Sequence, residues 1–117
     1  MVGAGGFLGA VLRYLIGFIP TGESTVFPIK TFLINVFGCL AIGAITIAAA
    51  KNTQIDPKRI LFMKVGLCGG FTTFSTFALE TTNLMKDGHM GIAFAYAMLS
   101  IVVGCAVIFG IEYILEI

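Results

Sequence analysis

Residues 90–111, MGIAFAYAMLSIVVGCAVIFGI, run for 22 positions without an Asp, Glu, Lys or Arg. A second stretch, TFLINVFGCLAIGAITIAAA at residues 31–50, does the same for 20 positions. An α-helix rises ~1.5 Å per residue, so about 20 residues cross a hydrocarbon core roughly 30 Å thick. Both stretches therefore predict transmembrane helices.

Two further apolar stretches contain isolated charges. Residues 60–85 include Lys64 and Glu80, and residues 2–19 include Arg13. Turn-forming Pro, Gly, Asn and Asp separate the four stretches. The first stretch has no basic segment before it, unlike a secretory signal peptide, so we expect a retained helix. We predict an all-α membrane protein that forms one four-helix transmembrane domain over residues 1–117, with helices at about 2–19, 30–50, 60–85 and 90–114.

The composition excludes several classes of protein. The chain is 58% hydrophobic and 11% charged, whereas a globular protein carries about 25% charged residues. Its 7 basic and 6 acidic residues are too few to cover a soluble domain, and there is no basic surface for nucleic acid. Cys39, Cys68 and Cys105 lie in apolar stretches without a C-x-x-C motif, and His89 lies in a loop. We therefore expect neither an enzyme nor a cysteine–histidine metal site, and the bilayer is the expected surrounding.

The basic residues do not set a clear orientation. With four spans, both termini and the loop after the second helix share one side, which holds four basic residues: Lys51, Lys58, Arg59 and Lys64. The other side holds Lys30 and Lys86, and Arg13 lies in the half of the first helix nearer to it. A division of 4 to 3 is a weak positive-inside bias. It permits insertion in both orientations and an antiparallel dimer, and it also permits a single orientation.

Small residues recur at a spacing of four. The pairs are Gly5 with Gly9, Gly6 with Ala10, and Gly66 with Gly70. Such pairs let helix backbones approach closely in a membrane. The spacing leaves open whether these contacts form within one chain or between chains.

Polar residues inside the predicted spans are candidates for function, because they are costly in lipid. Asn35 follows Thr31 by one turn, and Ser100 follows Tyr96 by one turn. The densest set is residues 69–80, GGFTTFSTFALE. Two glycines followed by hydroxyl residues favour a break in the third helix, since Ser and Thr can satisfy freed backbone groups. An unbroken helix whose hydroxyls bond to their own preceding turns is the alternative.

Three segments together resemble the signatures of the Fluc/CrcB fluoride channels. They are GFLGAVLRY at residues 6–14, TFLINVFG at 31–38 and GLCGGFTTFSTF at 66–77. The resemblance implies an antiparallel, dual-topology homodimer with two anion pores in the inner membrane of a prokaryote. It implies passive export of fluoride down its electrochemical gradient, which relieves toxicity. It also implies a structural sodium ion at the dimer interface, held by the backbone carbonyls of Gly69 and Thr72.

The same resemblance implies the residues of the fluoride pore. These are Thr31, Asn35, Phe74, Ser75, Thr76, Phe77, Tyr96 and Ser100. The chemistry suits a small, strongly hydrated anion, because amide and hydroxyl groups replace lost water and phenyl edges carry partial positive charge. Ligands of this strength also let the ion leave. Gly104 follows Ser100 by one turn and stands where the family can carry a further Ser. One hydroxyl is therefore missing from the row that Tyr96 and Ser100 begin on the fourth helix.

Three points stay open. Arg13 either attracts anions to a vestibule or reaches toward the interface, and Glu80 is protonated, hydrogen-bonded to Thr76, or part of an exit path. The alternative function is a small multidrug-type, proton-coupled antiporter of four helices. That class needs a carboxylate in the first helix, where this chain has Arg13 and no acid. An accessory membrane subunit without transport of its own is the third possibility, which the polar residues disfavour.

Overall fold

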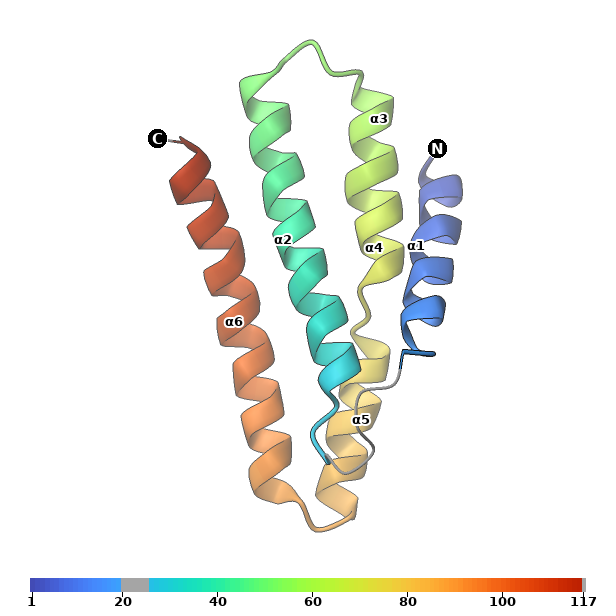
Figure 1. Ribbon diagram of the computed structural model, residues 1–117, viewed down its shortest axis with the longest axis vertical. Helices are drawn as coiled ribbons and strands as arrows, with labels where there is room; N and C mark the ends of the chain where they lie inside the picture. The colour runs from blue at the N-terminus through green and yellow to red at the C-terminus, as the bar shows by residue number, and fades with distance from the viewer. Residues whose placement is uncertain (20–25, 117) are drawn as a thin grey trace.

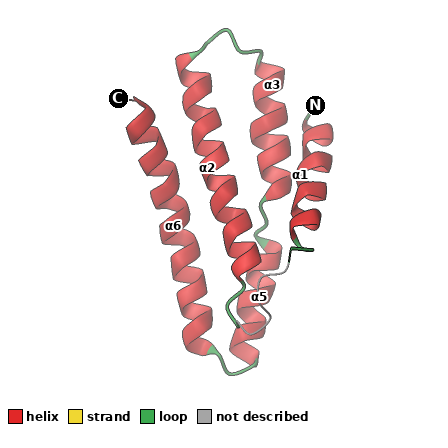
Figure 2. Cartoon of the chain, in the orientation of Figure 1, coloured by secondary structure: helices red, strands yellow, loops and turns green. Residues whose placement is uncertain are grey.

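The computed structural model describes residues 1–19 and 26–116, and in these ranges it consists of helices and loops without a strand (Figures 1 and 2). The turn expected at residues 20–24 lies outside the described residues. The helices are α1 (Val2–Ile16), α2 (Ile29–Lys51), α3 (Pro57–Leu61), η1 (Phe62–Cys68, a π-helical stretch), α4 (Gly69–Phe71), α5 (Ser75–Lys86) and α6 (Met90–Glu116).

Three spans are long and apolar enough to cross a membrane. They are α2, α6, and the succession of α3, η1, α4 and α5 from Pro57 to Lys86. The first helix, α1, is shorter: it ends at Ile16 and not at residue 19 as expected. The N–H of Gly17 is shared between the carbonyls of Arg13 and Tyr14, so the last turn tightens and residues 17–19 form a turn.

Local sequence signals explain two of the connections. Asp56 caps the third span, since its side chain accepts a hydrogen bond from Lys58 N at 2.9 Å, and Pro57 occupies the first helical position. Between α5 and α6, Gly88 adopts φ 84°, and the N–H of His89 donates to Leu84 O at 2.8 Å. This is the glycine-containing helix ending in which a left-handed residue reverses the chain.

Glycines bring α1 against the third span. A Cβ atom on Gly66 would lie 2.7 Å from the carbonyl oxygen of Val2, and one on Gly70 would lie 2.5 Å from that of Gly6. Gly5 and Gly9 meet the backbone of η1 and α4 equally closely. The small-residue pairs of α1 and the third span therefore form contacts within one chain, backbone against backbone.

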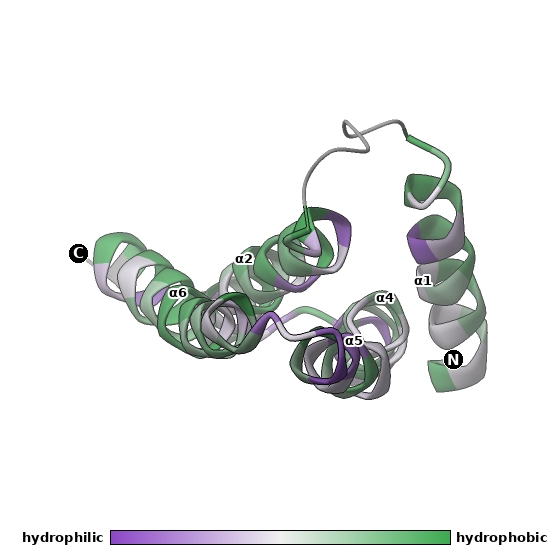
Figure 3. Ribbon diagram, turned by 90° about the horizontal axis from the view of Figure 1, so that it is seen from below, coloured by the Kyte–Doolittle hydropathy of each residue, from purple (hydrophilic) through white to green (hydrophobic). Residues whose placement is uncertain are grey.

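The remaining packing is α2 against α6 and α5 against α6, so that α1 and α6 lie at opposite sides (Figure 1). Both termini and the α2–α3 loop lie at one end. The buried core is small, and many large apolar side chains face outward, including Phe7, Phe94 and Phe109. The hydropathy colouring shows purple, hydrophilic residues mainly on α5, whereas α6 and much of α1 and α2 are green (Figure 3). The exposed surface of these three helices is mostly apolar. Such a surface is stable only against lipid or another chain, as in a membrane protein.

Candidate ion pathway

The third span is broken between α4 and α5. Helix α4 ends at Phe71, Thr72 has the extended values φ −80° and ψ 161°, and the helix resumes at Ser75. The expected break is therefore present and falls at the hydroxyl residues Thr72 and Thr73, while the preceding Gly69 and Gly70 remain helical. Gly70 is needed instead for the close contact with α1.

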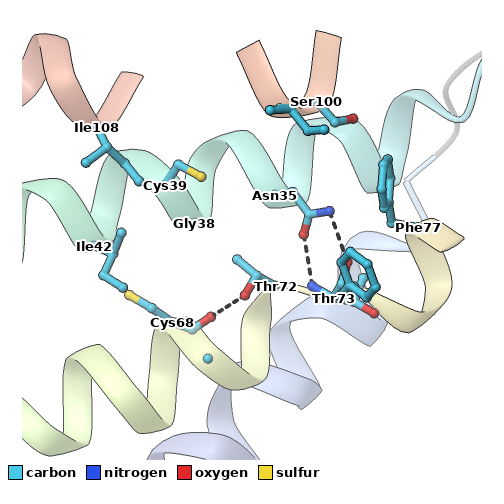
Figure 4. A pocket seen from close by; sticks show the side chains of 13 residues that line it. Asn35, Gly38, Cys39, Ile42, Cys68, Thr72, Thr73, Phe77, Ser100 and Ile108 are labelled. Carbon is cyan, nitrogen blue, oxygen red and sulfur yellow. Dashed lines mark hydrogen bonds between the residues drawn. The ribbon is translucent and has the colours of Figure 1, made fainter. Parts of the chain in front are cut away.

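The side chain of Asn35, on α2, pairs with the backbone of Thr73 in the break (Figure 4). Its Nδ2 donates to the Thr73 carbonyl at 3.1 Å, and the Thr73 N–H donates to its Oδ1 at 2.9 Å. A backbone N–H or C=O left unpaired away from water is costly. One amide side chain thus satisfies both main-chain groups of the residue at the centre of the break.

The break also frees carbonyl groups of the preceding turn. The Thr73 N–H, which would bond to Gly69 O in a continuous helix, is bonded to Asn35, and the Thr76 N–H donates to Thr73 Oγ1 at 3.3 Å instead of Thr72 O. The carbonyl of Gly70 accepts a hydrogen bond from Arg13 Nε at 3.3 Å. Arg13 therefore binds the broken span, a role that neither expectation for this residue included.

A largely apolar groove of about 430 Å³ runs along the break (Figure 4). Among the expected site residues it includes Asn35, Gly69, Thr72, Phe74, Phe77 and Ser100. The Ser100 hydroxyl is buried and has no hydrogen-bond partner in the described part of the chain. A hydroxyl in this state is free to bind a polar species that enters the groove.

Aromatic rings continue from the groove toward the core. The ring centroids of Phe74 and Phe77 are 5.9 Å apart, and those of Phe77 and Tyr96 are 5.0 Å apart. Phe74 is 79% exposed, whereas Tyr96 is fully buried and also packs against Phe27 at 5.3 Å. The row of rings thus runs from the surface of the chain to its interior.

Glu80 is bound by Tyr96. The Tyr96 hydroxyl donates to Glu80 Oε1 at 3.2 Å, so the partner of this carboxyl group is not Thr76, one of the expected possibilities. Thr31, on α2, is a buried polar residue as well. The Tyr96–Glu80 hydrogen bond joins α6 to α5 next to the aromatic row.

The structure therefore brings most expected site residues together. Ser75, at the start of α5, is exposed and does not line the groove, and Arg13 lies on the other side of the third span. Sequence reasoning assigned no role to Thr73, although it lies in the polar stretch 69–80, and it missed Phe27, for which the sequence has no distinguishing signal. It also missed a row on α2 that lines the groove with Asn35, namely Gly38, Cys39 and Ile42. Their spacing of three, four and seven residues is the signal that could have identified them.

Backbone carbonyl groups are the candidate ligands for the expected sodium ion. The described residues contain no group of three or more His, Cys, Asp or Glu side chains suited to a metal ion. Gly69 and Thr72 line the groove, and their carbonyl oxygens lack the helical donors that a continuous helix would supply. Carbonyls of an unwound helix are the ligands that hold Na⁺ in membrane proteins, so these residues fit such an ion.

A helical chain with membrane-length spans, a broken helix and a groove at the break into which a few polar groups point belongs to the class of membrane transport proteins. Residues 1–111 match the family described as CrcB-like protein, Camphor Resistance (CrcB). The chain belongs to this family.

Curated relatives cover nearly the whole chain. A protein of Chlorobaculum tepidum is 43% identical over 109 residues, which are 93% of this chain and 86% of the relative. One of Methylobacillus flagellatus is 42% identical over 106 residues, 89% and 83% of the two chains. One of Azobacteroides pseudotrichonymphae is 36% identical over 109 residues, 92% and 87%. All three relatives are named "Fluoride-specific ion channel FluC".

Proposed function

We propose that this protein is a fluoride-selective ion channel of a prokaryotic inner membrane and exports fluoride passively. The observation that carries the proposal is the grouping of Asn35, Phe74, Phe77 and Ser100 around one groove in a chain whose relatives are named fluoride-specific channels. The proposed activity is transport down an electrochemical gradient and not catalysis.

The groups in the groove suit fluoride because they donate without binding it tightly. Asn35 uses one amide N–H for Thr73 and retains a second. The Ser100 hydroxyl is a further donor, and the edges of Phe74 and Phe77 present partial positive charge. In this proposal an ion exchanges water for these ligands in succession, and none of them carries a fixed positive charge that would retain it. Thr31, Tyr96, Ser75 and Thr76 would supply the flanking hydroxyl groups, and Glu80 would lie along the exit path.

The active unit in this proposal is an antiparallel, dual-topology homodimer with two pores. The groove is open along one side of the single chain, and Phe74 at its edge is 79% exposed. An exposed phenylalanine next to polar groups calls for a covering surface, and a second copy supplies one. The weak bias in basic residues, four against three, permits the second copy to insert in the opposite sense.

We place a structural sodium ion at the centre of this dimer. Gly69 and Thr72 would hold it through their backbone carbonyls, and one chain offers two such oxygens where a sodium ion needs more. A second copy would complete the set. When bound, the ion would link the two broken helices electrostatically; the conduction path itself would consist of side chains.

The proton-coupled antiporter is not favoured. None of the 15 residues of α1 is acidic, and the curated relatives are named as ion channels. The decisive experiment reconstitutes the purified protein in liposomes loaded with potassium fluoride and records efflux with a fluoride electrode after valinomycin is added. We expect fluoride efflux without a proton gradient and no efflux of chloride. Absence of fluoride efflux, or efflux only with a proton gradient, would refute the proposal.

Replacing Asn35 or Phe74 in the same liposomes tests the pore residues, and unchanged flux would reject their assignment. The sodium site has its own readout. Exchange of sodium for N-methylglucamine during purification should shift the protein from dimer to monomer in size-exclusion chromatography. An unchanged elution volume would remove sodium from the proposal and leave the channel function standing.

A further inference from the structure

Two cationic side chains lie at the end of α1. Arg13 lies in its last turn, and Lys30 Nζ, from the start of α2, donates to the carbonyl oxygen of Gly17 at 2.8 Å. Gly17 follows Arg13 by four residues, and its N–H donates to the Arg13 carbonyl at 3.3 Å, so both positions lie on one face of the chain. The carbonyl end of a helix attracts cations, and two positive charges at the same helix end favour an anion there.

A hollow and an aromatic pair lie at the same place. The hollow, of about 380 Å³, is lined by Ala10, Arg13, Tyr14, Gly17 and Phe18. The rings of Tyr14 and Phe18 pack edge to face with centroids 5.0 Å apart, and they are 69% and 67% exposed. The amphipathic ring of a tyrosine such as Tyr14 is typical of the boundary between lipid tails and headgroups.

The hollow lies where α1 ends. Helix α1 ends at Ile16, near the level at which the third span breaks, while α5 continues beyond it (Figure 1). Long cationic side chains at a helix end reach toward the headgroups of the bilayer.

We propose that the hollow at the end of α1 binds the phosphate group of an anionic membrane phospholipid. Arg13 uses Nε for the carbonyl of Gly70, and the terminal nitrogens of the guanidinium group provide the paired donors that suit a phosphate. Lys30 supplies the second charge, and the first part of an acyl chain covers Tyr14 and Phe18. A free ion would leave these two rings uncovered, which is why we assign the site to a lipid and not to inorganic phosphate or fluoride.

Native mass spectrometry of the purified protein, titrated with phosphatidylglycerol in detergent, tests this proposal. We expect one tightly bound lipid per chain and about fivefold weaker binding to Lys30→Gln, the loss expected for removing one lysine beside an anionic lipid. Lys30→Arg should retain binding. Lys86→Gln is the matched control, because Lys86 ends α5 as an exposed lysine outside the hollow. Equal affinities for the two glutamine variants would overturn the proposal.

Competition distinguishes the possible sources of the anion. A large excess of sodium phosphate or sodium fluoride over the lipid, at constant ionic strength, should leave the bound lipid in place. Displacement by either salt above the effect of sodium chloride would assign the hollow to a free anion and overturn the lipid site. The measurement involves no fluoride transport, so its failure and the failure of the proposed channel function are separate results.

Discussion

The Asn35 amide and the backbone of Thr73 form a closed pair of hydrogen bonds, at 3.1 and 2.9 Å, across the interface of α2 with the broken span. Two residues on neighbouring β-strands exchange the same pair of N–H and C=O bonds. Here the side-chain amide of Asn35 takes the place of one of the two backbones. It allows the third span to interrupt its own hydrogen bonding without leaving Thr73 unpaired in a non-aqueous interior.

Replacing Asn35 by Ala should destabilise the protein as well as reduce fluoride flux. Two backbone groups lose their partners, and each costs about 1–3 kcal/mol when buried and unpaired. Thermal unfolding in detergent micelles measures the loss. Asn83→Ala is the control, since Asn83 lies exposed on α5. If the two variants unfold at the same temperature, the pairing does not support the break.

Replacing Phe74 by Ile should lower fluoride flux about tenfold, equivalent to about 1.4 kcal/mol, while the fold is retained. The side chain stays apolar and of similar size, but the ring edge that faces an anion is lost. Liposome efflux measures the rate. Phe109, 72% exposed on α6 and outside the groove, gives the matched variant Phe109→Ile, which should conduct normally. Equal rates for both variants would contradict the role of Phe74.

Removing the Tyr96 hydroxyl should loosen the contact between α5 and α6. Tyr96→Phe keeps the buried ring in place but takes away the donor to Glu80, so we expect a loss of about 1–3 kcal/mol in unfolding free energy. Tyr113→Phe, at an exposed tyrosine of the same helix, should be neutral. In the double variant Tyr96→Phe with Glu80→Leu, no carboxyl group is left unpaired, so part of the stability should return. A double variant less stable than Tyr96→Phe alone would argue against this pairing.

A methyl group added at Gly70 should separate α1 from the third span. The new Cβ would lie 2.5 Å from the Gly6 carbonyl oxygen, a backbone atom that cannot move aside alone. We expect Gly70→Ala to lose about 1–3 kcal/mol, the usual cost of overpacking. Gly3→Ala, where no atom lies within 4 Å, should be neutral or slightly stabilising, as Ala favours a helix. Unfolding in detergent compares them, and equal stability would show that α1 adapts to the added group.

The all-helical fold with long apolar helices was predictable from the sequence, because uncharged runs of membrane length have few alternatives. The exact end of α1 was not, since residues 17–19 are as apolar as those before them and only the tightened turn at Gly17 marks the boundary. The break was predicted from its glycines and hydroxyls, and it falls at the hydroxyl residues Thr72 and Thr73, after the glycines. A glycine in a helix can provide either flexibility or room for close packing. For Gly70 only the three-dimensional position of Gly6 shows that it provides room for packing.

For the site, the sequence indicated which side chains are polar within the membrane but not which groups they bind. Asn35 was predicted as a pore donor, and the structure shows that it also binds the backbone of Thr73. Arg13 was expected either to attract anions or to reach toward the membrane interface. Its contact with the Gly70 carbonyl was not expected, because the two residues are 57 positions apart and no local sequence pattern indicates such a contact. Long-range bonds to main-chain atoms are independent of the partner's residue type, so the sequence does not record them.

The two side chains that bind the break, Arg13 and Asn35, both precede it in the chain. During synthesis their helices leave the ribosome before residues 70 and 73, so the partners of the freed backbone groups exist when the third span is made. Because of this order, the backbone groups freed by the break have hydrogen-bond partners as soon as the third span enters the membrane. A circular permutant that moves α1 to the far end of the chain would keep every final contact but lose this temporal advantage.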